Sequence, residues 1–299
     1  MDGWRTALAF FAEDDPATRF RPGGLTSIRA VSDSVQSWTR KSPFERKGRE
    51  KSLLDGYKIT VMRYFAPDNF FNRMMEAVCD SWVSNAGKIG PVGKTSERLY
   101  SLDVQYPDGS MIRYSGMALK TVNLLIQSGR IVSEESIWVP LKAETLDSLE
   151  GARPESVKMT PAALAGHYLD TSLPAVTSAD WPDVASRVFS SQIIFERDLY
   201  ACNYKTTGEA TRHVKGAWEI TGQGTMRLPP SDFSLALNED TEAALFWKIA
   251  HPELASVLNV AVPNAIVRVN NQEALAGEIE HTLDFHAKSV DNDTAFISL

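Results

Sequence analysis

Alternating apolar and polar residues dominate the chain, and this pattern predicts a protein built mainly from β-strands. The first clear run is Tyr57–Tyr64, which alternates as a half-buried strand does. Pro67-Asp68-Asn69 then offers a helix start, and residues 69–83 carry Phe, Met, Val and Trp at helical spacing. We expect a helix there, ended by Asn85-Ala86-Gly87, whose residue types favour a helix C-cap.

Further strands are expected after that helix. Leu99–Tyr106 alternates, Pro107-Asp108-Gly109-Ser110 is a strong turn sequence, and Met111–Tyr114 returns as the hairpin partner. Two more strand-like runs follow at Leu119–Ile126 and Ile131–Leu141. The first half of the chain therefore predicts several strands and one helix.

Weaker patterns flank this block. Residues 1–24 favour loops around their prolines and glycines, and residues 25–38 suit either a short helix or irregular strands. Residues 40–51 are basic without an apolar period, which is typical of an exposed loop. Residues 142–183 are broken by prolines and indicate a connector, with one helical segment expected at Pro161–Tyr168.

The second half repeats this order of elements. Gln192–Tyr204 is strand-like and leads to a turn at residues 206–208. His213–Thr221 and Thr225–Leu228 are expected as short strands joined at Gly222-Gln223-Gly224. Asn238 can cap a helix, because acidic residues fill the first turn that follows it. The apolar residues of that expected helix are Ala244, Leu245, Trp247, Ile249 and Ala250.

The chain is expected to end in strands. Val257–Val262 and Ala265–Val269 are predicted as partners joined by a turn at Pro263-Asn264. Ile279–Ala287 alternates, and Ala295–Leu299 supplies a last strand.

A possible internal repeat shapes the expected fold. Gly56 and Gly216 each precede an aromatic-bearing strand ending Ile-Thr, although any two α+β halves resemble one another to this extent. We expect a β-rich α+β fold with two sandwich or barrel units, each packed by one helix. The predicted divisions are an N-terminal arm and loop (1–50), a first β-rich unit (51–141), a connector (142–184) and a second β-rich unit (185–299).

Composition narrows the class of protein. The chain has 299 residues, of which 43% are hydrophobic and 23% charged, and these values exclude a disordered or fibrous protein. Its 31 Lys and Arg against 38 Asp and Glu leave a formal charge of −7. That balance argues against a protein that grips nucleic acid through a basic surface.

Cysteine use and the N-terminus bear on the compartment. Cys79 and Cys202 fit neither a metal site nor a disulfide framework, so we expect a reducing compartment. The apolar run at residues 7–11 is too short for a signal peptide, and no apolar stretch is long enough to span a bilayer. We expect a protein kept in the cytoplasm or built into a particle there.

No sequence pattern indicates a catalytic, cofactor or metal site. Phosphate-binding glycine loops, the serine-nucleophile motif and the paired-histidine zinc motif are all absent from the sequence. His281 and His286 fall on opposite faces of one expected strand, as do Glu134 and Glu135. Asp291-Asn292-Asp293 favours a turn over a calcium loop. We therefore expect no enzyme and no cofactor.

Aromatic residues raise the question of subunit contacts. An apolar N-terminal arm with Trp4, Leu8, Phe10 and Phe11 is compatible with pairing between subunits. The tryptophans suit either core packing or interfaces, where this residue is enriched. They are Trp4, Trp38, Trp82, Trp138, Trp181, Trp218 and Trp247.

The C-terminal block has a characteristic order of strands. Residues 256–265 contain Val-Pro-Asn-Ala, residues 278–287 end Phe-His-Ala, and an acidic turn leads to Phe296–Leu299. This order resembles the ending of bacteriophage tail tube proteins, some of which carry two such units. Residues 50–126 are similar in outline, whereas the connector departs from the pattern and the first 50 residues match nothing in it.

The resemblance implies a structural protein of the virion tail, assembled in the host cytoplasm. Six copies would form a ring, and stacked rings would form a tube through which double-stranded DNA is ejected without specific binding. The partners would be further copies of the chain and other tail proteins, namely sheath, terminator, baseplate and tape measure, with no membrane. Sheet edges would pair between neighbours, and an acidic bore would repel phosphates.

Two other classes of protein remain open from the sequence. One is a different non-enzymatic α+β protein, such as a capsid, baseplate or host-interaction module. The other is an enzyme, which needs polar residues converging at strand ends. A ring-forming protein needs instead alternating strands with uncovered edges.

Overall fold

A computed structural model describes most of the chain. The described residues are 8–33, 56–90, 98–127, 132–148, 153–154, 163–170, 188–202, 209–228, 241–251, 254–275, 278–288 and 294–299. Within them the protein is β-rich, with a single helix, α1 (Asn69–Val78). The expected basic loop at 40–51, the turn at 206–208 and Asp291-Asn292-Asp293 lie outside these residues.

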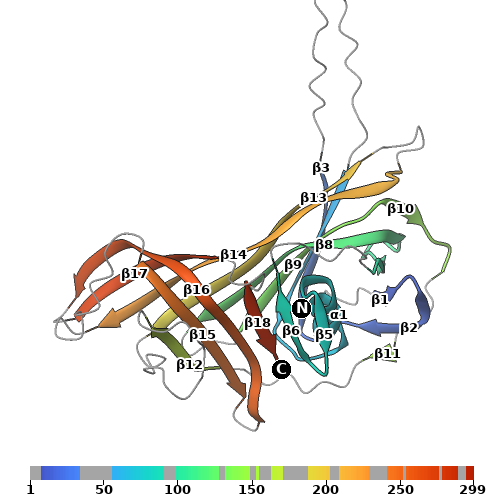
Figure 1. The fold of residues 1–299 in the computed structure, drawn as a ribbon. Helices are drawn as coiled ribbons and strands as arrows, with labels where there is room; N and C mark the ends of the chain where they lie inside the picture. Colours follow the sequence, from blue (N-terminus) through green and yellow to red (C-terminus); the bar gives the residue numbers. More distant parts are fainter. Residues whose placement is uncertain are drawn as a thin grey trace, which may run out of the picture.

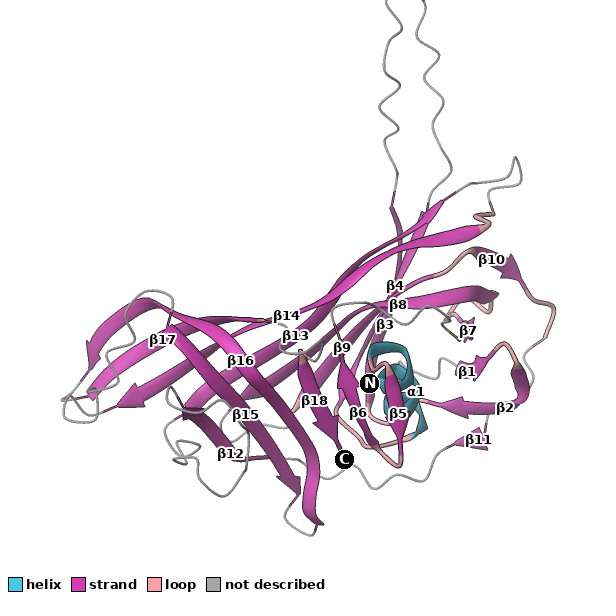
Figure 2. Cartoon of the chain, viewed as in Figure 1, coloured by secondary structure: helices cyan, strands magenta, loops and turns pink. Residues whose placement is uncertain are grey.

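The strands vary from short edge pieces to very long ribbons, as Figures 1 and 2 show. Their bounds are β1 (Leu8–Ala12), β2 (Asp15–Arg21), β3 (Leu25–Asp33), β4 (Gly56–Tyr64), β5 (Ser81–Val83), β6 (Ala86–Ile89), β7 (Tyr100–Gln105), β8 (Met111–Gln127), β9 (Ser133–Val139), β10 (Lys142–Thr145), β11 (Arg153–Pro154), β12 (Ala163–Asp170), β13 (Val188–Cys202), β14 (Arg212–Leu228), β15 (Thr241–His251), β16 (Leu254–Leu275), β17 (Glu278–Ala287) and β18 (Ala295–Ser298).

One long antiparallel sheet carries most of these strands (Figure 1). Its order is β3–β4–β9–β8–β13–β14–β17–β16–β15–β12. A branch leaves β16 through β18, β6 and β5. A smaller sheet runs β11–β2–β1–β7–β8–β10, so β8 belongs to both sheets.

Gly116 lets β8 pass from the smaller sheet to the long one. The residue adopts φ +64°, which L side chains rarely adopt, and a Cβ there would lie 2.9 Å from Leu141 carbons. Residues before Gly116 pair with β7 and β10, Met117 still pairs with Tyr100 of β7, and residues from Ala118 onward pair with β9 and β13. The strand runs predicted separately at Met111–Tyr114 and Leu119–Ile126 are therefore one bent strand.

The predicted turn at Pro263-Asn264 is wrong, because β16 continues through it. These two residues lie opposite the single residue Ala244 of β15, between the pairs Leu245–Val262 and Ala243–Ala265. Such an irregularity bends a strand and lets side chains on both sides of it stay inward. Val262 and Ala265 are both buried as a result. The expected break at Gly222-Gln223-Gly224 is also wrong, since β14 is continuous there.

The predicted helix at 69–83 is confirmed in its first ten residues. Asp68 caps α1 by accepting a hydrogen bond from the Phe71 backbone at 2.9 Å. The helix ends at Val78, earlier than expected, and the β5–β6 hairpin follows (Figure 2). Ser84 and Asn85, with φ 53° and 64°, make the two-residue turn of that hairpin rather than a C-cap.

The second expected helix, at 238–250, is wrong over its described residues. They form β15, in which Leu245, Trp247 and Ile249 face the core. Phe246 is also buried, and a strand covered on both faces has a continuous apolar run that imitates a helix. The short helix expected at Pro161–Tyr168 is wrong over its described residues, which lie in β12 and pair along β15.

Strands also replace several expected loops. Residues 8–33 form β1, β2 and β3, although loops and an undecided segment were expected there. Leu8, Phe10 and Phe11 are buried within their own chain, so this part of the N-terminal arm is core rather than free to pair between subunits. The connector begins with β10, which extends the smaller sheet, and contains β12.

Both predicted β-rich units contribute to one core. Phe10, Trp138 and Tyr100 from the first half belong to the same buried cluster as Trp218 and Trp247 from the second. The β8–β13 pairing joins the two halves edge to edge across seven residue pairs. The predicted boundary between units therefore runs through one continuous sheet.

Candidate functional site

The outward side of the long sheet is a broad polar surface. Along β9, β8, β13, β14 and β17, alternate residues face the core, and the residues between them face outward. The outward residues of these strands are called the polar face, and its polar members include Lys120, Asn123, Glu135, Gln192, Glu196, Asp198, Arg212, Glu219, Thr221, Gln223, Glu280, Asp284 and His286.

Strand register aligns these residues across the sheet. Glu135 stands opposite Asn123, Asn123 opposite Ile194, and Ile194 opposite Thr221. Thr221 in turn stands opposite His286 on β17. The polar face is thus an ordered array of aligned rows, in which each side chain reaches those on neighbouring strands.

A chain of side-chain hydrogen bonds crosses four strands of the polar face. Asn123 Nδ2 donates to Glu135 Oε2 at 3.4 Å, and Gln192 Nε2 donates to Asn123 Oδ1 at 3.0 Å. Gln223 Nε2 donates to Gln192 Oε1 at 3.0 Å. Asn123 and Gln192 therefore each donate and accept, Gln223 donates, and this amide ladder fixes the orientation of side chains that would otherwise move freely.

The polar face carries an excess of negative charge. Its carboxylates are Glu135, Glu196, Asp198, Glu219, Glu280 and Asp284. Its cationic residues include Arg212, at one end of β14, and Lys120, whose Nζ lies 3.6 Å from Glu196. Glu196 and Glu219 are direct cross-strand partners, an arrangement that costs stability because the charges are alike. Folding alone does not favour this pair.

Gly222 sets the close packing beneath the amide ladder. A Cβ there would lie 2.0 Å from the Gln192 backbone oxygen and 2.5 Å from the Phe285 ring. The missing side chain lets the Phe285 ring cross under β14, where it packs 5.1 Å from the Trp247 ring. Trp247 Nε1 also donates to Ser191 Oγ at 2.7 Å, which ties β15 to β13 through the core.

A buried ionic cluster holds β4, β9 and α1 together. Arg63 donates to Glu134 Oε1 at 2.6 Å and Oε2 at 2.9 Å, and to Asp68 Oδ2 at 2.6 Å. All three side chains are fully buried. Burial acts to lower the pKa of Arg63, but the carboxylates of Glu134 and Asp68 outweigh it and raise the pKa. Burial raises the pKa of Glu134 against the opposing effect of Arg63.

The residues that the sequence offered as candidates for a catalytic or metal site lie apart from one another. Glu134 and Glu135 do face opposite ways: Glu134 binds Arg63 inside, and Glu135 belongs to the polar face. Cys79 is buried and Cys202 is half-buried. His213 Nε2 lies 2.8 Å from the Val139 backbone oxygen at the end of β9. None of these positions brings catalytic groups together.

Other features were missed by the sequence reasoning. Alternation could have placed Asn123, Gln192 and Gln223 on the outward face, but only strand order and register make them neighbours.

Within the described residues, no cluster of three or more His, Cys, Asp or Glu side chains could hold a metal ion. No helix among those same residues is long and apolar enough to cross a membrane.

Comparison with known proteins leaves the family open: no protein-family model matches the chain, and no curated protein matches it significantly. Function is therefore inferred from the polar face and from the edges and exposed surfaces around it.

Proposed function

We propose that the protein is a structural subunit of a bacteriophage tail tube, in which six copies form a ring and rings stack into a conduit for DNA. The polar face would line the bore. The observation that carries this proposal is the continuous sheet, which is apolar on the core side and ordered, polar and net acidic on the outward side.

The charge of the polar face suits a wall past which DNA slides. Its carboxylates outnumber its amines, so phosphates are repelled rather than held. At physiological ionic strength such repulsion reaches about 8 Å, so the acidic residues must lie on the bore surface itself to act. The amide ladder adds fixed dipoles without adding positive charge.

The same proposal gives the protein its partners. Further copies would surround the bore, and sheath, terminator, baseplate and tape measure proteins would contact the tube. The virion tail would be the site of action, after assembly in the host cytoplasm. No enzyme activity or cofactor is part of this proposal.

Self-assembly tests the proposed function. Purified protein is concentrated stepwise and analysed by size-exclusion chromatography with light scattering, then by negative-stain microscopy. The proposal predicts sixfold rings or hollow tubes that grow in number with concentration. A monodisperse monomer at the highest concentration would refute it.

A further inference from the structure

A row of side chains on the polar face brings two carboxylates together. Glu196 on β13 stands directly opposite Glu219 on β14 and, on its other side, opposite Thr121 on β8. These three residues are called the acidic row. Direct cross-strand partners have Cβ atoms about 4.5–5.5 Å apart, which is close enough for two glutamate carboxylates to hold one ion between them. The two like charges repel each other at this spacing, and a bound cation would remove that repulsion.

Thr121 supplies a second, independent observation. Its side chain is only 7% exposed, and its Oγ1 has no hydrogen-bond partner within the described residues. A buried hydroxyl without a partner costs free energy in the folded protein. Of its two cross-strand partners, Ile137 is apolar and only Glu196 is polar. The hydroxyl is therefore an unused oxygen at the β8 end of the acidic row.

The charges around the acidic row favour a cation. Lys120 Nζ lies 3.6 Å from Glu196 Oε1, so this carboxylate already turns toward β8 and attracts positive charge. Asp198 lies on the same face and adds a third carboxylate. Arg29 ends the same row on β3, four strands away or about 19 Å at ordinary strand spacing, and Arg212 lies at the far end of β14. Salt screens charges beyond about 8 Å, so neither arginine neutralises the row.

The ligand atoms of the acidic row select a hard divalent cation. Carboxylate and hydroxyl oxygens suit Mg²⁺, Ca²⁺ and Mn²⁺, whereas softer metals prefer nitrogen and sulfur ligands. Two carboxylates and one hydroxyl leave much of an octahedral shell to water. Mg²⁺ keeps several of its waters when bound and is commonly held by one or two carboxylates together with phosphate oxygens. The row therefore fits hydrated Mg²⁺ best.

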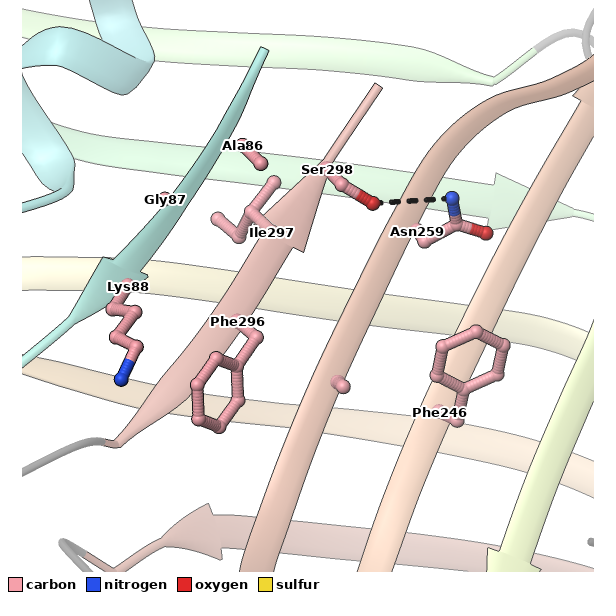
Figure 3. Close-up of a pocket in the computed structure, with 9 residues that line it drawn as sticks. Ala86, Gly87, Lys88, Phe246, Asn259, Phe296, Ile297 and Ser298 are labelled. Carbon is pink, nitrogen blue, oxygen red and sulfur yellow. Dashed lines mark hydrogen bonds between the residues drawn. The ribbon is translucent and has the colours of Figure 1, made fainter. Parts of the chain in front are cut away.

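The hollow shown in Figure 3 lies on other strands and has a different chemistry. It lies over β15, β16, β18 and β6, with a volume of about 440 Å³. Phe246 and Phe296 line it, and its lining includes one charged side chain, Lys88, and no carboxylate. An ammonium group and aromatic rings supply no oxygen ligand for Mg²⁺. The hollow therefore does not compete with the acidic row as a cation site.

We propose that the acidic row binds a hydrated Mg²⁺ ion through the carboxylates of Glu196 and Glu219, with the Thr121 hydroxyl as a further oxygen. Lys120 releases Glu196 as the ion binds. The site itself does not depend on ring formation, but its effect on DNA rests on the proposed function. In the bore, the ion would cancel the local negative charge and offer phosphates a contact through its waters.

Metal-dependent stability tests the site. Protein kept below the concentration at which it assembles is unfolded by heat in MgCl₂ and in NaCl of equal ionic strength. Mg²⁺ should give the higher unfolding temperature, and Glu196→Gln or Glu219→Gln should raise the half-saturating Mg²⁺ concentration about tenfold. Asp284→Asn is the matched control, because Asp284 shares the polar face but stands opposite Gln223 and Arg268. It should keep the Mg²⁺ effect.

Two variants at the β8 end separate a ligand from a structural role. Thr121→Val should be at least as stable as the natural protein without Mg²⁺, because it removes an unpaired buried hydroxyl, yet should need several-fold more Mg²⁺. Equal destabilisation in both salts would mean a structural role and would overturn the assignment of Thr121. Lys120→Met should lower the half-saturating Mg²⁺ concentration, because it removes the competing ammonium group, and an unchanged value would count against the site.

The outcomes for this site and for the proposed function are distinguishable. Rings that form while stability responds equally to MgCl₂ and NaCl would overturn the Mg²⁺ site and leave the ring function standing. Mg²⁺ binding that depends on Glu196 and Glu219, in a protein that never assembles, would overturn the ring function and leave the site standing.

Discussion

Replacing Arg63 with methionine is expected to destabilise the protein by about 3–5 kcal/mol, the usual cost of breaking a buried ion pair from one side. The guanidinium makes three hydrogen bonds of 2.6–2.9 Å to Glu134 and Asp68, all fully buried. Asp68 keeps its bonds from the Gly23 and Phe71 backbone amides, so Glu134 bears most of the loss. Urea unfolding followed by circular dichroism measures the free energy.

The pH dependence of this variant has a definite sign. Without Arg63, burial and the nearby Asp68 carboxylate both act on Glu134 and raise its pKa further above the ordinary glutamate value. A carboxyl with a raised folded-state pKa makes the folded state bind protons more tightly than the unfolded state does. The variant should therefore regain stability as the pH falls through the raised pKa of Glu134, and should be least stable at neutral pH and above.

Two further variants sharpen the result. Arg63→Met combined with Glu134→Met removes both charges and is expected to cost less than Arg63→Met alone. The matched control is Arg73→Met on α1, where a partly exposed pair with Glu76 contributes about 0–1 kcal/mol. If Arg63→Met costs no more than the control, or if its loss does not shrink at low pH, the reasoning is wrong.

Three more predictions concern the long sheet. Gly222→Ala should lower the free energy of unfolding in urea by about 1–3 kcal/mol, because the new Cβ would lie 2.0 Å from the Gln192 backbone oxygen. Gly224→Ala should cost less, since its Cβ would lie 3.6 Å from the Ser190 backbone oxygen, and equal costs would contradict this packing. Trp247→Phe should lower the free energy of unfolding by about 1–3 kcal/mol, because it removes the hydrogen bond from Trp247 Nε1 to Ser191 Oγ. Adding Ser191→Ala to Trp247→Phe should cost little more, since that bond is already lost, and additive costs would contradict this coupling. Glu219→Lys should make assembled protein co-sediment with double-stranded DNA at low salt and release it at high salt, and salt-independent binding would contradict the charge argument.

The sequence predicts strands best where one face meets the core and the other faces outward. Tyr57–Tyr64 and Ile279–Ala287 are examples, and β4 and β17 match them closely. The helix α1 was also predictable, because Asp68 supplies a cap and one face is apolar. Local alternation and capping are enough in these segments.

Sequence patterns do not predict the structure where contacts between residues far apart along the chain determine it. Residues 244–247 of β15 are buried on both faces, so this apolar run shows no strand period. Pro263-Asn264 has turn residues, yet pairing on both sides of it makes an irregularity within one strand. The amide ladder depends on β8 meeting β13, a pairing between residues about seventy positions apart that no local pattern reports.

In the proposed assembly, six copies surround a bore lined by the polar face. A cryo-electron microscopy reconstruction of the assembled protein tests it directly. A sixfold ring is expected, in which Asn123, Glu135, Gln192 and Gln223 face the central channel. A ring with these residues on its outer wall, or a particle without a channel, would contradict it.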